Sequence, residues 1–362
     1  MILTIIVFIL ILGILIFAHE LGHFISAKKA GVRVDEFGFG FPPRLFAIKK
    51  GETTYSLNLF PVGGFVKIFG EDATEKRTKS KRAFYNKPIW QRVIIIAMGV
   101  IMNLFLAAIF LSIVFGIGVP SLVEQGQEAN YRNVQIQILE VAKESPAEEA
   151  GIKTGDAIST LYFEDKAVTV KEPEDIQKFI AMHTGEEITV EIKRGKEIFQ
   201  KNLIPRVSYP KDEGAMGIAM AKIGTISYPW YQAILKGFET TGKLFITIIG
   251  LFYLLIKSLI LEGKMIGEIA GPVGIYSLTS QMVKLGVVYV LQFTAIFSIT
   301  LAIINIIPIP ALDGGRLLFL AIEKIRGKPL KPKTEQLANS IGFAIIILLM
   351  IVVTFRDIIK LF

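Results

Sequence analysis

The sequence predicts a polytopic α-helical membrane protein with about four transmembrane helices, a membrane-associated β-region and one inserted α+β domain. Three observations predict this fold class. The chain has 362 residues, of which 52% are hydrophobic, and its mean hydropathy is positive, which is too apolar for a simple soluble chain. Several apolar runs are long enough to cross a bilayer. A stretch of ordinary globular composition, residues 121–209, interrupts these runs.

Charge and cysteine content narrow the possibilities. The formal net charge is +8, but the basic residues gather beside the apolar runs, so they indicate the cytoplasmic side of a membrane and not nucleic-acid binding. The two most basic loops are residues 28–92 and 316–334. The sequence has no cysteine, which excludes disulfides and Cys-type zinc sites. Any metal site must therefore use His, Asp or Glu.

The first apolar run, from Ile2 to about Ser26, is predicted to be a transmembrane helix. It has no basic start and no small-residue cleavage site, so it does not resemble a cleaved signal peptide. It carries an H-E-x-x-H motif in which His19 and His23 fall on one helix face and can bind a single Zn²⁺. Glu20 then lies beside the metal as a general base for water.

The alternative for this motif is a helix end that carries two histidines by chance. Two of the three histidines in the chain belong to it, at a depth where ionisable groups are costly. Chance is therefore the weaker explanation.

Residues 28–92 are predicted to contain two strands, Val34–Phe41 and Thr53–Phe69, because these stretches are rich in β-branched and aromatic residues and are bounded by Gly and Pro. A sheet beside the H-E-x-x-H helix can offer an edge to which an unwound chain adds as a strand. Hairpins that merely lie against the membrane are an equally open interpretation.

The second span, Val93–Val119, contains Gly99 and Asn103 in a G-x-x-x-N spacing. The small residue allows close helix approach and the amide can form an interhelical hydrogen bond. Ordinary helix packing is the default explanation of this weak motif.

The globular insert contains the run Ser-Pro-Ala-x-x-Ala-Gly-x-x-x-Gly-Asp at residues 145–156. This run resembles the signature of PDZ domains of the bacterial protease type, which bind extended peptides or chain ends by strand addition. Strands are expected at Val134–Val141 and Ile188–Arg194, and a helix at Pro173–Met182. His183 is interpreted as a surface residue and not as a ligand.

The later apolar run, Leu285–Ile309, ends in the sequence N-x-x-P-x-P-x-L-D-G-G at residues 305–315. Its prolines break the helix, and broken backbone at membrane depth lines a cavity or is buried in protein. The last span runs from about Leu337 to Val353. Residues 226–261 are apolar but carry charges, so they are either a span or an interfacial helix.

Loop charge decides between these two possibilities. Both basic loops are expected in the cytoplasm, so residues 226–261 and 285–309 cannot both cross. The later run crosses, the earlier one lies along the outer surface or dips into the membrane, and both termini and the insert are outside. The predicted division is 1–27 first transmembrane helix, 28–92 β-region and basic loop, 93–120 second helix, 121–209 PDZ-like domain, 210–284 interfacial segment, 285–315 third helix, 316–334 basic loop and 335–362 fourth helix.

A catalytic zinc needs three protein ligands and one open position. Asp313 is the candidate for the third ligand, because it lies in the helix break of the other apolar run that carries an acid. Taken alone, Asp313 is better explained as a cap of the following helix. The amide of Asn305 can hold a substrate carbonyl or an oxyanion, or equally form an interhelical hydrogen bond.

H-E-L-G-H, G-x-x-x-N, a single PDZ-like insert and N-x-x-P-x-P-x-L-D-G-G, in this order, resemble the site-2 protease family, of the bacterial RseP type. The resemblance covers nearly the whole chain. It implies one Zn²⁺ per chain held by His19, His23 and Asp313, with Glu20 as catalytic base and Asn305 assisting the substrate or transition state. The implied substrate-binding residues are Leu57, Asn58, Leu59, Gly64, Phe65 and Asn103. Some relatives carry two tandem PDZ domains, whereas this chain has room for one.

The resemblance implies a zinc-dependent endopeptidase of the bacterial inner membrane that cuts the transmembrane segments of single-span membrane proteins. The implied substrates are anti-sigma factors or signal-peptide remnants. The cut usually follows a first cut by another protease. A peptide or chain end is expected at the PDZ-like domain, and no nucleic acid. One alternative is a non-catalytic membrane scaffold with a structural zinc. Another is a zinc transporter, which needs several polar clusters across its spans, whereas the sequence shows essentially one.

Overall fold

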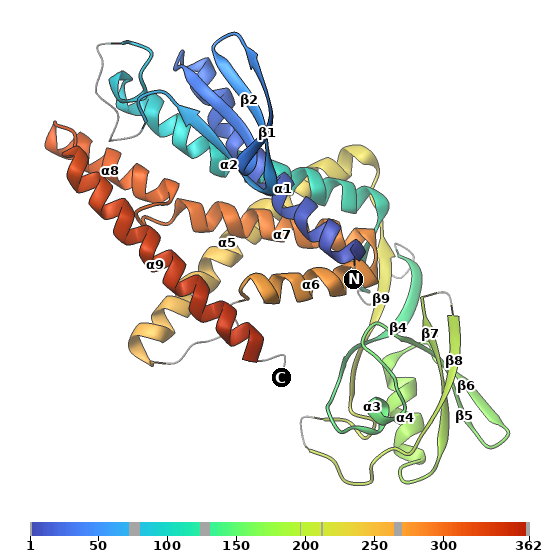
Figure 1. Ribbon diagram of the computed structural model, residues 1–362. Helices are drawn as coiled ribbons and strands as arrows, with labels where there is room; N and C mark the ends of the chain where they lie inside the picture. Colours follow the sequence, from blue (N-terminus) through green and yellow to red (C-terminus); the bar gives the residue numbers. More distant parts are fainter. Residues whose placement is uncertain are drawn as a thin grey trace. The chain divides into compact units, whose positions relative to one another are not determined.

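The computed structural model describes residues 2–71, 80–123, 131–195, 197–210, 213–263 and 270–359. The chain divides into two compact units (Figure 1): unit 1 comprises Met1–Val114 and Trp230–Phe362, and unit 2 comprises Phe115–Pro229. Part of the predicted basic loop, residues 72–79, lies outside the described residues.

Unit 1 is mostly helical. Its helices are α1 (Ile2–Lys29), the 3₁₀ turn η1 (Phe84–Asn86), α2 (Ile89–Ile117), α5 (Trp230–Leu261), α6 (Pro272–Leu285), α7 (Val287–Ile306), α8 (Asp313–Arg326) and α9 (Pro332–Ile359). Among the described residues, five helices are long and apolar enough to cross a membrane, namely α1, α2, most of α5, α7 and α9. Four of them correspond to the four predicted spans, and α5 is the segment that was expected to lie along the surface.

Two contacts, one near the start of α5 and one in the first turn of α6, lie near the C-terminal ends of other helices. Near its start, Gly237 lies against Ala108 and Ser112, close to the C-terminal end of α2. Beyond its end, the backbone N–H of Gly274 in the first turn of α6 donates to Asp357 Oδ2 at 2.7 Å, near the C-terminal end of α9. Since α2 and α9 both begin at basic loops, the start of α5 and the start of α6 lie at the side away from those loops.

Strands β1 (Val34–Lys50) and β2 (Thr53–Ile68) form an antiparallel sheet in unit 1. Each long strand pairs with the other twice: Phe37 pairs with both Val66 and Tyr55, and Tyr55 pairs with both Phe37 and Ile48. Four segments therefore lie side by side in the order 64–68, 34–39, 53–58 and 44–50. The first and last of these are edges, and the segment 53–58 is interior.

The sheet lies along the second half of α1. At one end of the sheet, Glu52 accepts from Lys28 at 2.9 Å and from Arg82 at 2.6 Å, and Arg82 and Lys28 together lower the pKa of Glu52 to about 2. Towards the other end, the rings of Phe17 and Phe39 are 6.2 Å apart. Lys28 and Phe17 are separated by about 16 Å of helix, at about 1.5 Å per residue. The sheet thus reaches the level of the H-E-x-x-H motif.

A buried apolar cluster joins the ends of these elements. It consists of Ala27, Val32, Val34, Ile68, Phe84, Ile95, Ile96 and Leu320. Beside it, the buried guanidinium of Arg92 at the start of α2 makes two hydrogen bonds, of 3.0 and 2.5 Å, to the carboxylate of Glu323 on α8. Paired bonds of this kind fix orientation as well as distance, so α8 is held rigidly against α2.

Unit 2 is an antiparallel sheet with two helices. Its elements are β3 (Val119–Leu122), β4 (Arg132–Val141), α3 (Pro146–Glu149), β5 (Ala157–Phe163), β6 (Lys166–Thr169), α4 (Pro173–Met182), β7 (Ile188–Arg194), β8 (Glu197–Leu203) and β9 (Ile218–Ile226). The strand order is β3-β9-β4-β5-β7-β8, with β6 paired to β5. The helix α4 and the strand β7 have the predicted bounds.

The residues of the signature run in unit 2 have structural roles. Ser145 caps α3 by accepting from the backbone N–H of Glu148 at 3.2 Å. Gly151 has φ of 74°, which favours glycine. Asp156 is buried and accepts two hydrogen bonds of 2.7 Å from Arg194. The run therefore organises the turn between α3 and β5.

Candidate active site

Three side chains from distant parts of unit 1 converge on one point. His19 and His23 lie one turn apart on α1, and Asp313 is the first residue of α8. Asp313 Oδ2 is 3.1 Å from His19 Nε2 and 3.3 Å from His23 Nε2, and the two Nε2 atoms are 3.1 Å apart. All three side chains are almost completely buried.

His23 and Asp313 each direct a lone pair into the cluster. His23 Nδ1 lies 2.9 Å from the backbone carbonyl of Ile95 and donates to it, so Nε2 of the neutral ring carries a lone pair. Asp313 Oδ2 is buried and makes no hydrogen bond to any described residue. Lone-pair atoms at such short distances repel one another unless they share a metal ion or a proton.

The spacing fits zinc. Tetrahedral Zn²⁺ with bonds of about 2.0–2.1 Å places its ligand atoms about 3.3 Å apart, and the observed separations are 3.1 to 3.3 Å. Two imidazoles and one carboxylate with a fourth position open is the donor set of catalytic zinc. The carbonyl of Ile95 supplies the outer hydrogen bond that a zinc-binding histidine needs.

Two glycines make room for the imidazoles between α1 and α2. A Cβ atom at Gly99 of α2 would lie 2.5 Å from His23 Nε2 and 2.7 Å from His19 Cε1. A Cβ atom at Gly22 of α1 would overlap the carbonyl of Met98. The G-x-x-x-N motif pointed to Gly99 as a close-packing position, but its contact with the histidines is visible only in the folded chain.

Glu20 faces the sheet beside the cluster. Its Cγ atom is 3.6 Å from the position that a Cβ atom would occupy at Gly64. Gly64 and Phe65 belong to the edge segment 64–68, so an open strand edge runs next to the candidate base.

The remaining predicted residues of the sheet lie elsewhere. Leu57 pairs with both Phe39 and Phe46, and the side chain of Asn58 donates to the Gly40 carbonyl at 3.0 Å. The segment 53–58 is interior, so an added strand cannot pair with Leu57 or Asn58. That Leu57 and Asn58 bind substrate stays a prediction, in which strand addition to them has no part. Leu59 follows this segment and is exposed.

Two asparagines lie near the helices of the cluster. Asn103, one turn beyond Gly99, is 1% exposed, and neither polar atom of its amide has a hydrogen-bond partner among the described residues. A buried unpaired amide costs about 1–3 kcal/mol, which makes Asn103 a candidate for binding substrate. Asn305 is half-buried in the last turn of α7.

Asp313 is not an N-cap. Leu312 holds that position and Asp313 is the first helical residue of α8. One turn further, Arg316 forms an ion pair with Glu71, just after β2, which ties α8 to the end of the sheet.

His183 lies in unit 2, where its ring stacks on Phe163 with 4.0 Å between centroids. Sequence reasoning missed Ile95 and the Arg316–Glu71 pair, because neither has a motif of its own.

Comparison with known proteins agrees with this geometry. Residues 7–349 match the model of peptidase family M50. The chain belongs to peptidase family M50. It is 32% identical to the zinc metalloprotease RasP of Bacillus licheniformis, with 99% of both chains covered. It is 31% identical to the regulator of sigma-W protease RasP of Bacillus subtilis and 32% identical to RasP of Shouchella clausii, again over 99% of both chains.

Membership of peptidase family M50, the site-2 protease family, confirms the family predicted from the motifs. The protein is a membrane-embedded, multi-pass zinc metalloprotease. The predicted enzyme and its zinc are thereby confirmed, and the alternatives of a non-catalytic scaffold and a zinc transporter are not supported.

The substitution Gly99→Ala is expected to weaken zinc binding at least tenfold, because the added methyl group occupies the space of the two imidazoles, and outer-shell changes of metal sites cost about 10–100-fold. Zinc content of the purified protein after dialysis against a chelator measures the effect. The matched control is Gly242→Ala on α5, where a Cβ atom meets nothing within 4 Å. Equal zinc retention by both variants would contradict this description of the site.

Proposed function

We propose that the protein hydrolyses a peptide bond within the transmembrane segment of a single-span membrane protein. In this proposal His19, His23 and Asp313 hold the zinc and Glu20 is the catalytic base. The observation that carries it is the convergence of the three buried ligand atoms within 3.3 Å of one another, beside an acid and an open strand edge. Zinc held there supplies a Lewis acid that makes water nucleophilic near neutral pH.

The residues of the chain perform the remaining steps. The Glu20 carboxylate takes a proton from the attacking water and returns it to the leaving amine, as a general base and then a general acid. The side-chain N–H groups of Asn103 and Asn305 donate to the substrate carbonyl or to the oxyanion that develops from it. The Ile95 carbonyl keeps the ring of His23 in one tautomer and orientation.

A helical substrate needs a further aid, because its backbone carbonyls are engaged in hydrogen bonds four residues apart. Unwinding in lipid leaves backbone groups unsatisfied at a cost of several kcal/mol each. The edge segment 64–68 offers backbone groups at the level of Glu20. Strand addition there offsets the lost helical bonds and presents an extended chain to the base.

We infer a topology in which α1, α2, α7 and α9 cross the bacterial inner membrane and α5 lies along its outer surface. Loop charge places both basic loops in the cytoplasm. The contacts of Gly237 with α2 near its C-terminal end and of Gly274 with Asp357 on α9 support this arrangement, since the starts of α5 and α6 then lie on one side. Unit 2 is extracytoplasmic in this topology.

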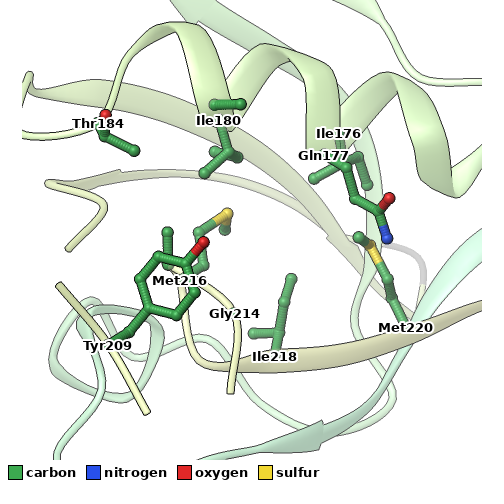
Figure 2. Close-up of a pocket in the computed structure, with 11 residues that line it drawn as sticks. Ile176, Gln177, Ile180, Thr184, Tyr209, Gly214, Met216, Ile218 and Met220 are labelled. Carbon is green, nitrogen blue, oxygen red and sulfur yellow. The ribbon is translucent and has the colours of Figure 1, made fainter. Parts of the chain in front are cut away.

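Unit 2 contributes a candidate peptide groove. A hollow of about 350 Å³ lies between α4 and strand β9 with its preceding loop (Figure 2). Ile176 and Ile180 point into it from α4, and Met216, Ile218 and Met220 point into it from the other side. These side chains give the groove an apolar lining.

An edge of β9 faces this groove. The strand pairs with β4 along most of its length, whereas the described part of β3 pairs with it from Ile223 onward. Among the described residues, the stretch from Ile218 to Ala221 has no strand partner on its other side, so it offers an edge to which a peptide can add. We propose that an extracytoplasmic chain end with an apolar last residue, produced by a first protease, binds there before the intramembrane cut. Anti-sigma factors and signal-peptide remnants are the substrate classes of this proposal.

The variant Glu20→Gln is expected to retain about one zinc per chain, since three ligands remain, and to lose cleavage by about 10²–10⁴-fold, the contribution of a positioned base. Asp313→Asn is expected to lose zinc and cleavage together. Co-expression with a single-span substrate and metal analysis of each purified variant measure both effects. Cleavage at the wild-type rate by both variants would refute the assignment.

A photocrosslinking phenylalanine in place of Phe65 is expected to capture substrate in the Glu20→Gln background. The same amino acid in place of Phe46 is the matched control, because Phe46 lies on the other edge of the sheet, in segment 44–50. Strand addition beside Glu20 predicts adducts at position 65 and few at position 46. Equal capture at both positions, or capture at 46 alone, would exclude the edge 64–68 as the substrate site.

Ala181→Trp is expected to fill the groove of unit 2 and weaken binding of a peptide with a free carboxyl end and an apolar last residue by at least tenfold, about 1.4 kcal/mol. Met182→Trp is the matched control, because Met182 is the next residue of α4, is 71% exposed and does not line the groove. Fluorescence anisotropy of the labelled peptide measures the affinity. Unchanged affinity of the Ala181→Trp variant would show that peptides do not use this groove.

A further inference from the structure

The loop that delivers Asp313 to the histidines has an unfavourable backbone. Ala311, two residues before Asp313, has φ of 78°, a left-handed conformation that is unfavourable for a residue with a side chain. Prolines at 308 and 310 precede it, so the chain cannot continue α7 and must turn within a few residues. Such a backbone persists only where the surroundings hold it.

The last helix contacts this loop directly. Asn339 Oδ1 on α9 accepts the backbone N–H of Ala311 at 3.1 Å. One turn further along α9, Gly342 is buried, and a Cβ atom there would overlap the carbonyl of Pro310. Residues three apart lie on one face of a helix. This face of α9 therefore lies against Pro310 and Ala311.

The rest of α9 buries little. Only 6% of the residues in its most apolar stretch are buried, and Phe343, Leu348 and Leu349 are exposed. A second attachment lies near its far end, where Asp357 accepts the N–H of Gly274 at 2.7 Å. In Figure 1, α9 (red) runs from the end of α8 towards α6. The contact of α9 with the loop at Pro310 and Ala311 is thus a local attachment and not part of a broad apolar interface.

We propose that Asn339 is a positioning residue for the zinc ligand Asp313, acting through the backbone of Ala311. The inference rests on the proposed role of Asp313 as ligand and extends it to a residue of α9. Asp313 Oδ2 lies at 3.1 and 3.3 Å from the two histidine nitrogens, and a ligand must be held within about 0.5 Å of its productive position. The contacts that fix α8 lie beyond Asp313, at Arg316, Leu320 and Glu323. Release of Ala311 from its left-handed conformation would therefore shift only the first residues of α8, and this shift would take the Asp313 oxygen out of reach.

The test measures zinc affinity of the full-length protein in detergent, by competition with a chromophoric chelator. Asn339→Leu keeps the size of the side chain and removes the acceptor, and its zinc affinity is expected to fall about 10–100-fold. Asn339→Asp keeps an acceptor oxygen, so its zinc affinity is expected to stay within about threefold of the wild-type affinity, a much smaller change than that of Asn339→Leu. Ser340→Ala, at the exposed neighbouring position of α9, is the matched control and is expected to bind zinc as wild type does.

A double variant separates positioning from general stability. Glycine adopts the left-handed conformation at no steric cost, so Ala311→Gly reduces the need for the Asn339 hydrogen bond. Zinc affinity of Ala311→Gly with Asn339→Leu is therefore expected to recover part of the loss caused by Asn339→Leu alone. A purely structural role of Asn339 on α9 predicts no such recovery.

Wild-type affinity in Asn339→Leu would overturn the inference and leave the proposed function standing. Absence of zinc from the wild-type protein would instead refute the proposed function. Should Asn339→Leu fail to fold, Asn339→Ala decides the question, because it also removes the acceptor. Zinc affinity of Asn339→Ala equal to that of wild type would then be the overturning result.

Discussion

The structure of unit 1 depends on three lone pairs that meet at one point. Two come from imidazoles of α1 and one from a carboxylate some 290 residues later, and their atoms lie 3.1 to 3.3 Å apart. Bare lone pairs at these distances repel one another, and a shared metal ion or proton removes the repulsion. The chain must therefore be rigid enough to hold the three groups in place before the metal binds.

The rigidity comes from both sides of the cluster. Between α1 and α2, the absence of side chains at Gly22 and Gly99 lets the helices approach until the imidazoles fill the space. On the other side, α8 is fixed by the paired hydrogen bonds of Arg92 and Glu323 and by Leu320 in the buried cluster. These contacts come from residues with no chemical role in peptide hydrolysis, and they bring the ligand at the start of α8 within reach of α1.

The position of a sheet beside a membrane-embedded site has a physical explanation. Backbone groups have no water to bond in lipid, so irregular or extended chain is tolerated only where protein satisfies it. The twofold pairing of β1 with β2 satisfies the interior segment 53–58 on both sides and leaves the segment 64–68 with an edge beside Glu20. The aromatic rings of Phe17, Phe24 and Phe37 attach the sheet to α1, which brings this edge to the level of the H-E-x-x-H motif.

The sequence by itself predicted the chemistry, since imidazoles four residues apart on an apolar helix can serve one metal ion wherever that helix lies. Asp313 became a candidate for the third ligand only beside those two histidines. The sequence also predicted four spans and, in unit 2, most of β4 and the whole of β7, because hydrophobic periodicity and turn residues are local signals. The described residues include a fifth helix, α5, that is long and apolar enough to cross a membrane. Only the tertiary structure decided which strand segment has a free edge, why Gly99 must lack a side chain, and that Asn339 contacts the loop before Asp313. Those facts depend on pairing and packing between residues far apart in the chain, and no local pattern encodes such distances.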